Sequence, residues 1–108
     1  MANTFKLKTK ANVGVTTSNV YTVPSATTTV VIGVTLANTS GSSINVGVGI
    51  TRASTDDIHL MKNVPIPQGS SFEFMGGNKI VLETTDILTV KSDVNNSLDV
   101  ALTIMDIT

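Results

Sequence analysis

Aliphatic side chains occupy every second position in two stretches of the chain, residues 30–36 and 44–50, always at even numbers. Side chains of an extended strand point alternately to its two faces, so each stretch predicts a β-strand with one apolar face. The residues between them, 37–43, are mostly Asn, Ser, Thr and Gly, which favour turns. We therefore expect these two strands to form a β-hairpin and to bury their even-numbered side chains.

Similar but shorter segments follow one another along the rest of the chain, and none has the periodicity of a helix. The last strand is expected to bury its even-numbered aliphatic residues from Leu98 to Ile104. Ile107 breaks that alternation, so a β-bulge or fraying is expected near Met105 and Asp106. The eight or nine expected strands cover approximately residues 5–10, 20–23, 28–38, 43–52, 58–62, 72–74, 79–83, 87–91 and 98–104.

The composition supports a β fold. Thr, Val and Ile make up 40 of the 108 residues (17, 14 and 9), and β-branched side chains fit a pleated sheet better than a helix. The predicted fold is all-β: an antiparallel two-sheet β-sandwich, jelly-roll or immunoglobulin-like, with a small barrel as the alternative. We expect a single domain over residues 1–108, in which residues 1–12 form an N-terminal edge strand or arm.

The charge of the chain narrows the classes of partner. Charged residues make up 14% of the chain, against about a quarter in typical domains. The net charge of −1 gives no general attraction to nucleic acid or to anionic lipid. No apolar run is long enough to span a membrane, and the N-terminus lacks the pattern of a signal peptide, so folding in a cytoplasm is expected. A weakly charged surface suits extensive subunit contact, although a rigid monomer is equally compatible with it.

Candidate catalytic and ligand-binding patterns are weak. His59 lies two residues after Asp57 and could be an oriented base, but a surface histidine is the simpler interpretation. Asp86 and Asp93 resemble turn residues more than calcium ligands, because no loop alternates Asp and Asn. Residues 76–79 contain glycines but no phosphate-binding motif, and the chain has no Cys. The prediction is a protein that is not an enzyme, with no catalytic, cofactor-binding or metal-binding residue.

Four basic residues are candidates for protein contact. Lys6, Lys8 and Lys10 alternate with apolar residues and predict a short strand with a basic outer face. Such lysines protect an edge strand from aggregation or meet an acidic partner, and contact with phosphates is the less favoured alternative. Arg52 follows an aliphatic strand, as either an interface anchor or a solvated strand end.

A fifth candidate is the face of residues 44–50 opposite to the aliphatic side chains. Asn45, Gly47 and Gly49 lie there and leave it almost without side chains. Glycine in a strand permits another backbone or sheet to approach closely, which favours a packing surface. A bulged or strongly twisted strand would explain the same residues.

Several segments together resemble small β-rich virion structural proteins of tailed bacteriophages, particularly phages of marine cyanobacteria. The segments are residues 20–32 with their Tyr-Thr-Val-Pro, 65–71 with Pro-Ile-Pro-Gln-Gly, 78–83, 85–90 and 98–102. The resemblance is one of pattern over nearly the whole chain, and it carries no binding residue that can be transferred.

This resemblance implies a non-enzymatic virion protein that decorates and stabilises the capsid in many copies, as a cement protein does. Its partners would be the major capsid protein and itself, with a trimer expected by analogy, and it would need no cofactor, nucleic acid or membrane. It would be found in the virion after assembly in the host cytoplasm. The alternative is a tail, neck or fibre-associated module that contacts the tail machine or the host surface.

Overall fold

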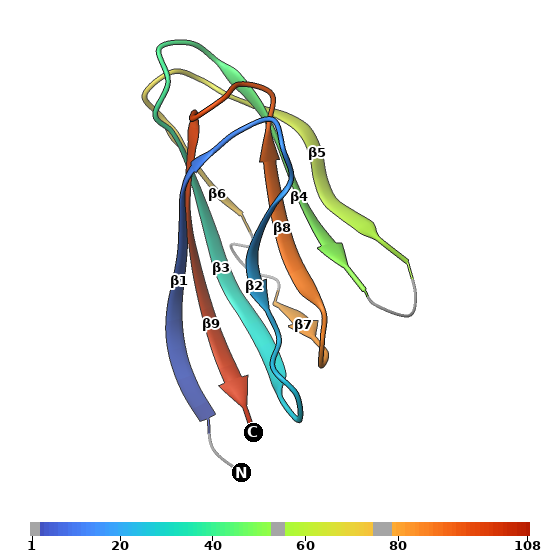
Figure 1. Cartoon of the computed structure of the whole chain (residues 1–108). Helices are drawn as coiled ribbons and strands as arrows, with labels where there is room; N and C mark the ends of the chain where they lie inside the picture. The colour runs from blue at the N-terminus through green and yellow to red at the C-terminus, as the bar shows by residue number, and fades with distance from the viewer. Residues whose placement is uncertain (1–2, 53–55, 75–78) are drawn as a thin grey trace.

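The structure, a computed structural model, describes residues 3–52, 56–74 and 79–108. These residues form nine β-strands and no helix, as Figure 1 shows. No helix that could cross a membrane is therefore found in the described part of the chain. The strands are β1 (Asn3–Val13), β2 (Ser18–Thr22), β3 (Thr28–Asn38), β4 (Ile44–Thr51), β5 (Ile58–Ile66), β6 (Ser71–Phe74), β7 (Ile80–Leu82), β8 (Ile87–Ser92) and β9 (Leu98–Ile107).

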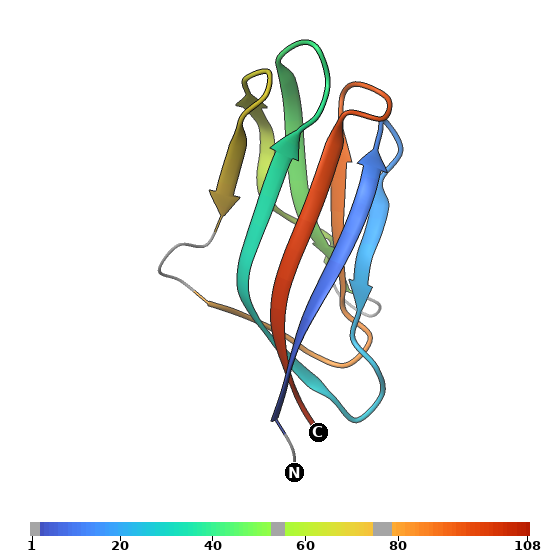
Figure 2. The ribbon, with the colours of Figure 1, turned by 90° about the vertical axis from the view of Figure 1, so that its left-hand side faces the viewer.

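The strands form two antiparallel sheets that face each other, which confirms the predicted β-sandwich. Sheet A has the order β1-β9-β3-β6, with β7 also paired to β3. Sheet B has the order β2-β8-β4-β5. Figure 2 shows the ribbons of β6, β3, β9 and β1 side by side in front of sheet B. Because β6 and β7 pair with two different parts of β3, they act together as one interrupted strand, and the strand order is that of a jelly roll.

The predicted hairpin between residues 30–36 and 44–50 is wrong. β3 belongs to sheet A and β4 to sheet B, so the loop between them crosses from one sheet to the other. The buried side chain of Asn38 holds this crossing: its amide donates to the carbonyls of Ser42 (2.8 Å) and Ile66 (2.9 Å). Its oxygen accepts hydrogen bonds from the backbone N–H and the hydroxyl of Ser40. The polar loop therefore forms an arch between the two sheets. Its composition is that of a hairpin turn, so composition alone does not distinguish an arch from a hairpin.

The predicted alternation holds along β4 and along β9 from Leu98 to Ile104, where every even-numbered aliphatic residue is buried. It holds only in the second half of β3. Val30 and Ile32 are partly exposed, while their odd-numbered neighbour Val31 is buried. β3 carries one extra residue against β9 between Val31 and Gly33, and this bulge reverses the faces of the strand.

The bulge or fraying expected near Met105 and Asp106 is also absent. β9 keeps its register with β1 as far as Ile107, and its alternation continues without interruption. The alternation therefore points Asp106 into the sandwich, where the side chain is almost fully buried.

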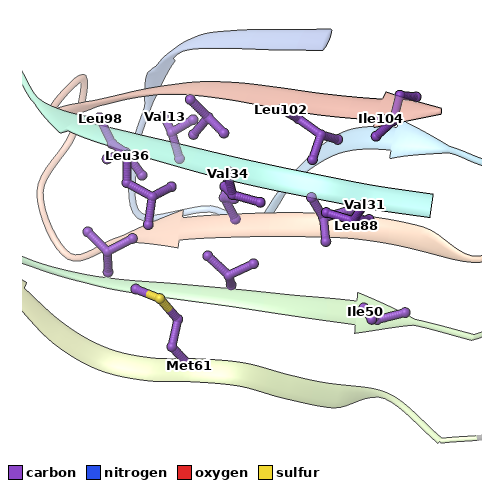
Figure 3. Packing of buried hydrophobic residues seen from close by; sticks show 14 of the residues in the cluster. Val13, Val31, Val34, Leu36, Ile50, Met61, Leu88, Leu98, Leu102 and Ile104 are labelled. Atoms are coloured by element: carbon purple, nitrogen blue, oxygen red, sulfur yellow. The ribbon is translucent and has the colours of Figure 1, made fainter. Parts of the chain in front are cut away.

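The core lies between the two sheets and is aliphatic. Figure 3 shows Val31, Val34 and Leu102 of sheet A directed towards Leu88 and Ile50 of sheet B. Burying an aliphatic side chain of this size contributes about 1.5–3 kcal/mol before the cost of ordering the chain. The largest fully buried side chains are Leu36, Ile44, Ile66, Leu82, Leu88, Leu98, Leu102 and Ile104.

Candidate functional site: protein-contact faces

The first strand turns its apolar side chains outwards, which corrects the expectation of a basic outer face. Phe5 is 70% exposed and Leu7 is 65% exposed. Lys6 and Lys8 are paired with the inward-facing Ile104 and Leu102 of β9, so they lie on the side of sheet A that faces sheet B. Both lysines are only partly exposed there.

This orientation brings Lys6 to the buried carboxylate of Asp106. Its Oδ2 accepts the Lys6 ammonium at 2.9 Å and the Tyr21 hydroxyl at 2.6 Å. Its Oδ1 accepts the Thr29 hydroxyl at 2.6 Å. The Lys8 ammonium lies 5.5 Å from the centre of the Tyr21 ring, within cation–π range. Strands of both sheets thus meet on one acid, and a buried charge needs such partners.

These contacts shift two pKa values. Burial by itself raises the pKa of Asp106, but the hydrogen bonds from Thr29, Tyr21 and Lys6, together with the Lys6 charge, outweigh burial and leave the pKa lowered. Burial, the hydrogen bond to Asp106 and its negative charge raise the pKa of Tyr21 to about 12. The carboxylate and the neutral phenol are therefore the stable forms, which fits a structural link between the sheets.

The outer face of sheet A carries an apolar ridge near the chain termini. Phe5 is paired with Met105, Met105 with Val30, and Val30 with Val81, so four apolar side chains form one row across β1, β9, β3 and β7. Val81 is 58% exposed, and Met105 and Val30 are partly exposed. With the neighbouring outward residues, the apolar ridge is Phe5, Leu7, Val30, Val81, Met105 and Ile107.

The opposite end of the same face is hollow, because its outward residues are small. A shallow depression of about 280 Å³ lies there. Asp99 stands at its side, accepting a hydrogen bond from the Asn12 N–H at 3.0 Å. We call this depression the small-residue hollow, and its floor is formed by Thr9, Ala11, Thr35, Ala37 and Ala101.

The outer face of sheet B contains a larger depression of about 610 Å³, and it contains Asn45, Gly47 and Gly49. Glycine is required at position 49 because the backbone of β5 approaches it closely. A Cβ there would lie 2.8 Å from the carbonyl oxygen of Ile58. A Cβ on Gly47 would meet nothing closer than 3.5 Å. Close packing inside the sheet therefore explains Gly49, whereas a Cβ at Gly47 would only make an ordinary contact with the carbonyl oxygen of Met61.

Arg52 forms ion pairs with two acidic residues of its own chain. Its guanidinium contacts Glu83 at 2.8 Å and Asp86 at 3.2 Å. The hydrogen bond and charge of Asp86, with a smaller effect of Glu83, raise the pKa of Arg52. The carboxylate of Asp86 also accepts the Glu83 N–H, so Arg52 ties the end of β4 to the turn before β8. Its role as an interface anchor stays a prediction.

His59 is the residue that the sequence offers as a candidate base. His59 is exposed on β5, and its side chain forms no hydrogen bond or ion pair with the other described residues. No group of three or more His, Asp and Glu side chains in the described part of the chain could hold a metal ion. Residues 76–78 of the glycine-rich segment lie outside the described residues.

Comparison with known proteins adds a fold relationship. No protein-family model matches the sequence, and no curated protein matches it either. The structure is similar to a subunit chain from a study titled "Bacillus endospore appendages form a novel family of disulfide-linked pili", with a TM-score of 0.60 and 11% sequence identity. The match covers 99% of this chain and 87% of that chain. At this identity the likeness concerns the fold alone.

Sequence reasoning missed the inward orientation of Lys6 and the outward orientation of Phe5. Lys6 and Phe5 alternate, and alternation says only that they lie on opposite faces, not which face is inside. The available signal was Asp106, an acid in phase with the buried residues of the last strand. A buried acid requires a cationic partner, and Lys6 in the other terminal strand is one that could reach it.

Proposed function

We propose that this protein is a non-enzymatic structural subunit that works by packing its outer faces against other protein chains in an assembly. The observation that carries the proposal is the exposure of Phe5 and Leu7 on β1, in an apolar row that continues through Met105 and Val30 to Val81. Exposed apolar side chains that adjoin one another mark interaction surfaces, whereas isolated ones are ordinary.

The kind of assembly follows from the sequence resemblance. Our first choice is a virion of a tailed phage, in which this chain decorates the capsid by binding the major capsid protein and its own copies. Many weak contacts on a repeating lattice give high occupancy without any single strong interface. A low-charge sandwich with contact faces on its outer surface suits that task.

A second candidate is a filament made of copies of this chain. The shared fold with a subunit of pili supports it. Those pili are described as disulfide-linked, but this chain contains no Cys, so a filament of it would be held without disulfide bonds. A tail, neck or fibre module remains the alternative placement in a virion.

The proposal is tested by imaging and counting. Negative-stain electron microscopy of the purified chain, and gold-labelled antibody on particles from cultures of the source organism, separate the assemblies. Labelled heads, with copy numbers near that of the major capsid protein, support decoration, and a few copies per particle support the tail. Filaments of the pure chain support the second candidate. A protein that stays monomeric and labels no assembly overturns the structural role.

A test of docking through the lysines of β1 needs a variant that leaves the fold intact. Lys6 binds the buried Asp106, so its exchange would act on stability. Lys10 is exposed and forms no ion pair with the described residues, which makes Lys10→Glu the suitable variant. Lower occupancy on particles would support an acidic docking partner, and unchanged occupancy would remove this strand from the docking surface.

A further inference from the structure

We propose that the outer face of sheet A binds the same face of a second copy, so that the apolar ridge of each chain fits the small-residue hollow of the other. This inference rests on the proposed structural role and names one contact of the assembly. The two copies are related by a two-fold axis that runs across the strands, so the strands of the two facing sheets run in opposite directions.

The register of sheet A makes the face complementary to itself. Leu7, Thr103 and Gly33 form the middle row of outward residues. The row of Phe5 lies on the terminal side of this middle row, and the row of Ala101 lies the same distance on the other side. A two-fold axis along the middle row therefore places each ridge row over a hollow row. Phe5 and Met105 then face Thr9 and Ala101 of the other copy, so the largest side chains of this row meet small ones, as close packing requires.

The outward positions of the ridge carry no acidic or basic side chain. Asp99, at the side of the hollow, faces Ile107 of the other copy, and its carboxylate keeps the hydrogen bond that it accepts from the Asn12 N–H. Glu73 is level with Ala101 at the β6 edge, and the axis carries it to the level of Val81 in the other copy. Lys79 is exposed and two residues before Val81, close to that level. Glu73 of each copy thus approaches Lys79 of the other at the rim.

The area is sufficient for a weak dimer. Four strands about 4.8 Å apart and nine residues of about 3.4 Å each give a flat footprint of roughly 590 Å². Projecting side chains make the accessible area larger, and a standard interface buries about 800 Å² per partner. The contact belongs to the low end of this range, which suits a subunit whose contacts gain strength in an array.

Sedimentation equilibrium of the full chain over a wide concentration range tests the contact. Leu7→Glu places a charge in the middle row and should raise the dimer dissociation constant at least tenfold. Val15→Glu is the matched control, because Val15 is 47% exposed and lines the depression of sheet B. Both exchanged side chains are solvent-exposed, so circular dichroism should show intact β structure in both variants.

Two further variants test the arrangement itself. Ala101→Phe fills the hollow and should weaken the dimer as strongly as Leu7→Glu. If the ridges of the two copies packed against each other instead, Ala101→Phe would leave the dimer dissociation constant unchanged. Glu73→Lys and Lys79→Glu should each weaken the dimer severalfold, and the double variant should restore it. A wild-type chain that is monomeric at all concentrations, or equal loss in the Val15 control, overturns the inference. If particles are still labelled in that case, the structural role stands and only the self-contact is lost.

Discussion

At the scale of single residues, Asp106 determines more of this molecule than any other polar side chain. Its carboxylate turns Lys6 inwards, and this in turn leaves Phe5 and Leu7 exposed on the opposite face of β1. The exposed apolar face of β1 thus lies opposite an ion pair between the partly exposed Lys6 and the buried Asp106. The partners of Asp106 come from β1 and β3, the neighbours of β9 in sheet A, and from β2 of sheet B.

Asp106→Asn should destabilise the protein by about 2–4 kcal/mol, since it removes the charge that Lys6 contacts and leaves the hydroxyls of Tyr21 and Thr29 with a poorer acceptor. Asp99→Asn is the matched control on the same strand, because Asp99 accepts a single backbone hydrogen bond at the surface. Urea unfolding at pH 7 measures both. An equal and small loss in the two variants would contradict the importance of the buried cluster.

The same acid predicts the response to low pH. Folding lowers the pKa of Asp106, so the unfolded chain takes up a proton first as the pH falls. The stabilisation is complete above the ordinary Asp pKa of about 3.9 and is lost as the pH falls below it. Urea unfolding between pH 7 and pH 2 should show this loss in the wild type and less of it in Asp106→Asn. Parallel curves for the two proteins would contradict the assignment.

Tyr21 predicts the response to high pH. Its pKa rises to about 12 on folding, so above the ordinary value of about 10 the unfolded chain releases the phenol proton first. The stabilisation is thus present below pH 10 and is lost between pH 10 and pH 12. Tyr21→Phe should remove this part of the alkaline loss while costing about 1 kcal/mol at pH 7. An identical alkaline profile in the variant would show that the phenol stays accessible.

At the scale of elements, the sequence predicts which segments are strands but not how they are joined. The alternation is confirmed in β4, and in β9 from Leu98 to Ile104, because the inward-facing residues of these segments are all aliphatic. In β3 the alternation is confounded by aliphatic residues on both faces, so the bulge at Ile32 cannot be read from it. The supposed hairpin fails for another reason: the hydrogen bonds of Asn38 to Ser42 and Ile66 direct the loop to sheet B, and Ile66 is distant in sequence.

The glycines of β4 allow a matched test at this scale. Gly49→Ala should destabilise the protein by about 1–3 kcal/mol, because the new Cβ would lie 2.8 Å from the backbone oxygen of Ile58 and the strands must separate. Gly47→Ala is the control, since its Cβ finds ordinary contact at 3.5 Å, and it should be neutral or slightly stabilising. Thermal unfolding of the pair measures the difference, and equal melting temperatures would contradict the close approach of β5.

At the scale of the whole molecule, the jelly roll joins the two ends of the chain. β1 pairs with β9 along nearly its whole length, so the apolar ridge contains residues from both terminal strands. The small-residue hollow is built in the same way, from Thr9 of β1 and Ala101 of β9. The apolar ridge and the small-residue hollow therefore exist only after the last strand has docked. Assembly through sheet A would thus select completely folded chains.

This topology also predicts slow folding. In the described part of the chain β4 and β5 are the only consecutive strands that pair with each other, and all other pairings join strands distant in sequence. Closing such long loops costs chain entropy before any contact is gained, so refolding should take milliseconds to seconds. Stopped-flow fluorescence of Tyr21, the single Tyr in a chain without Trp, can follow the docking of β2 against β9. Folding in microseconds would contradict the dominance of distant pairings. Leu7→Glu should leave the rate at low protein concentration unchanged, because its side chain is exposed in the monomer.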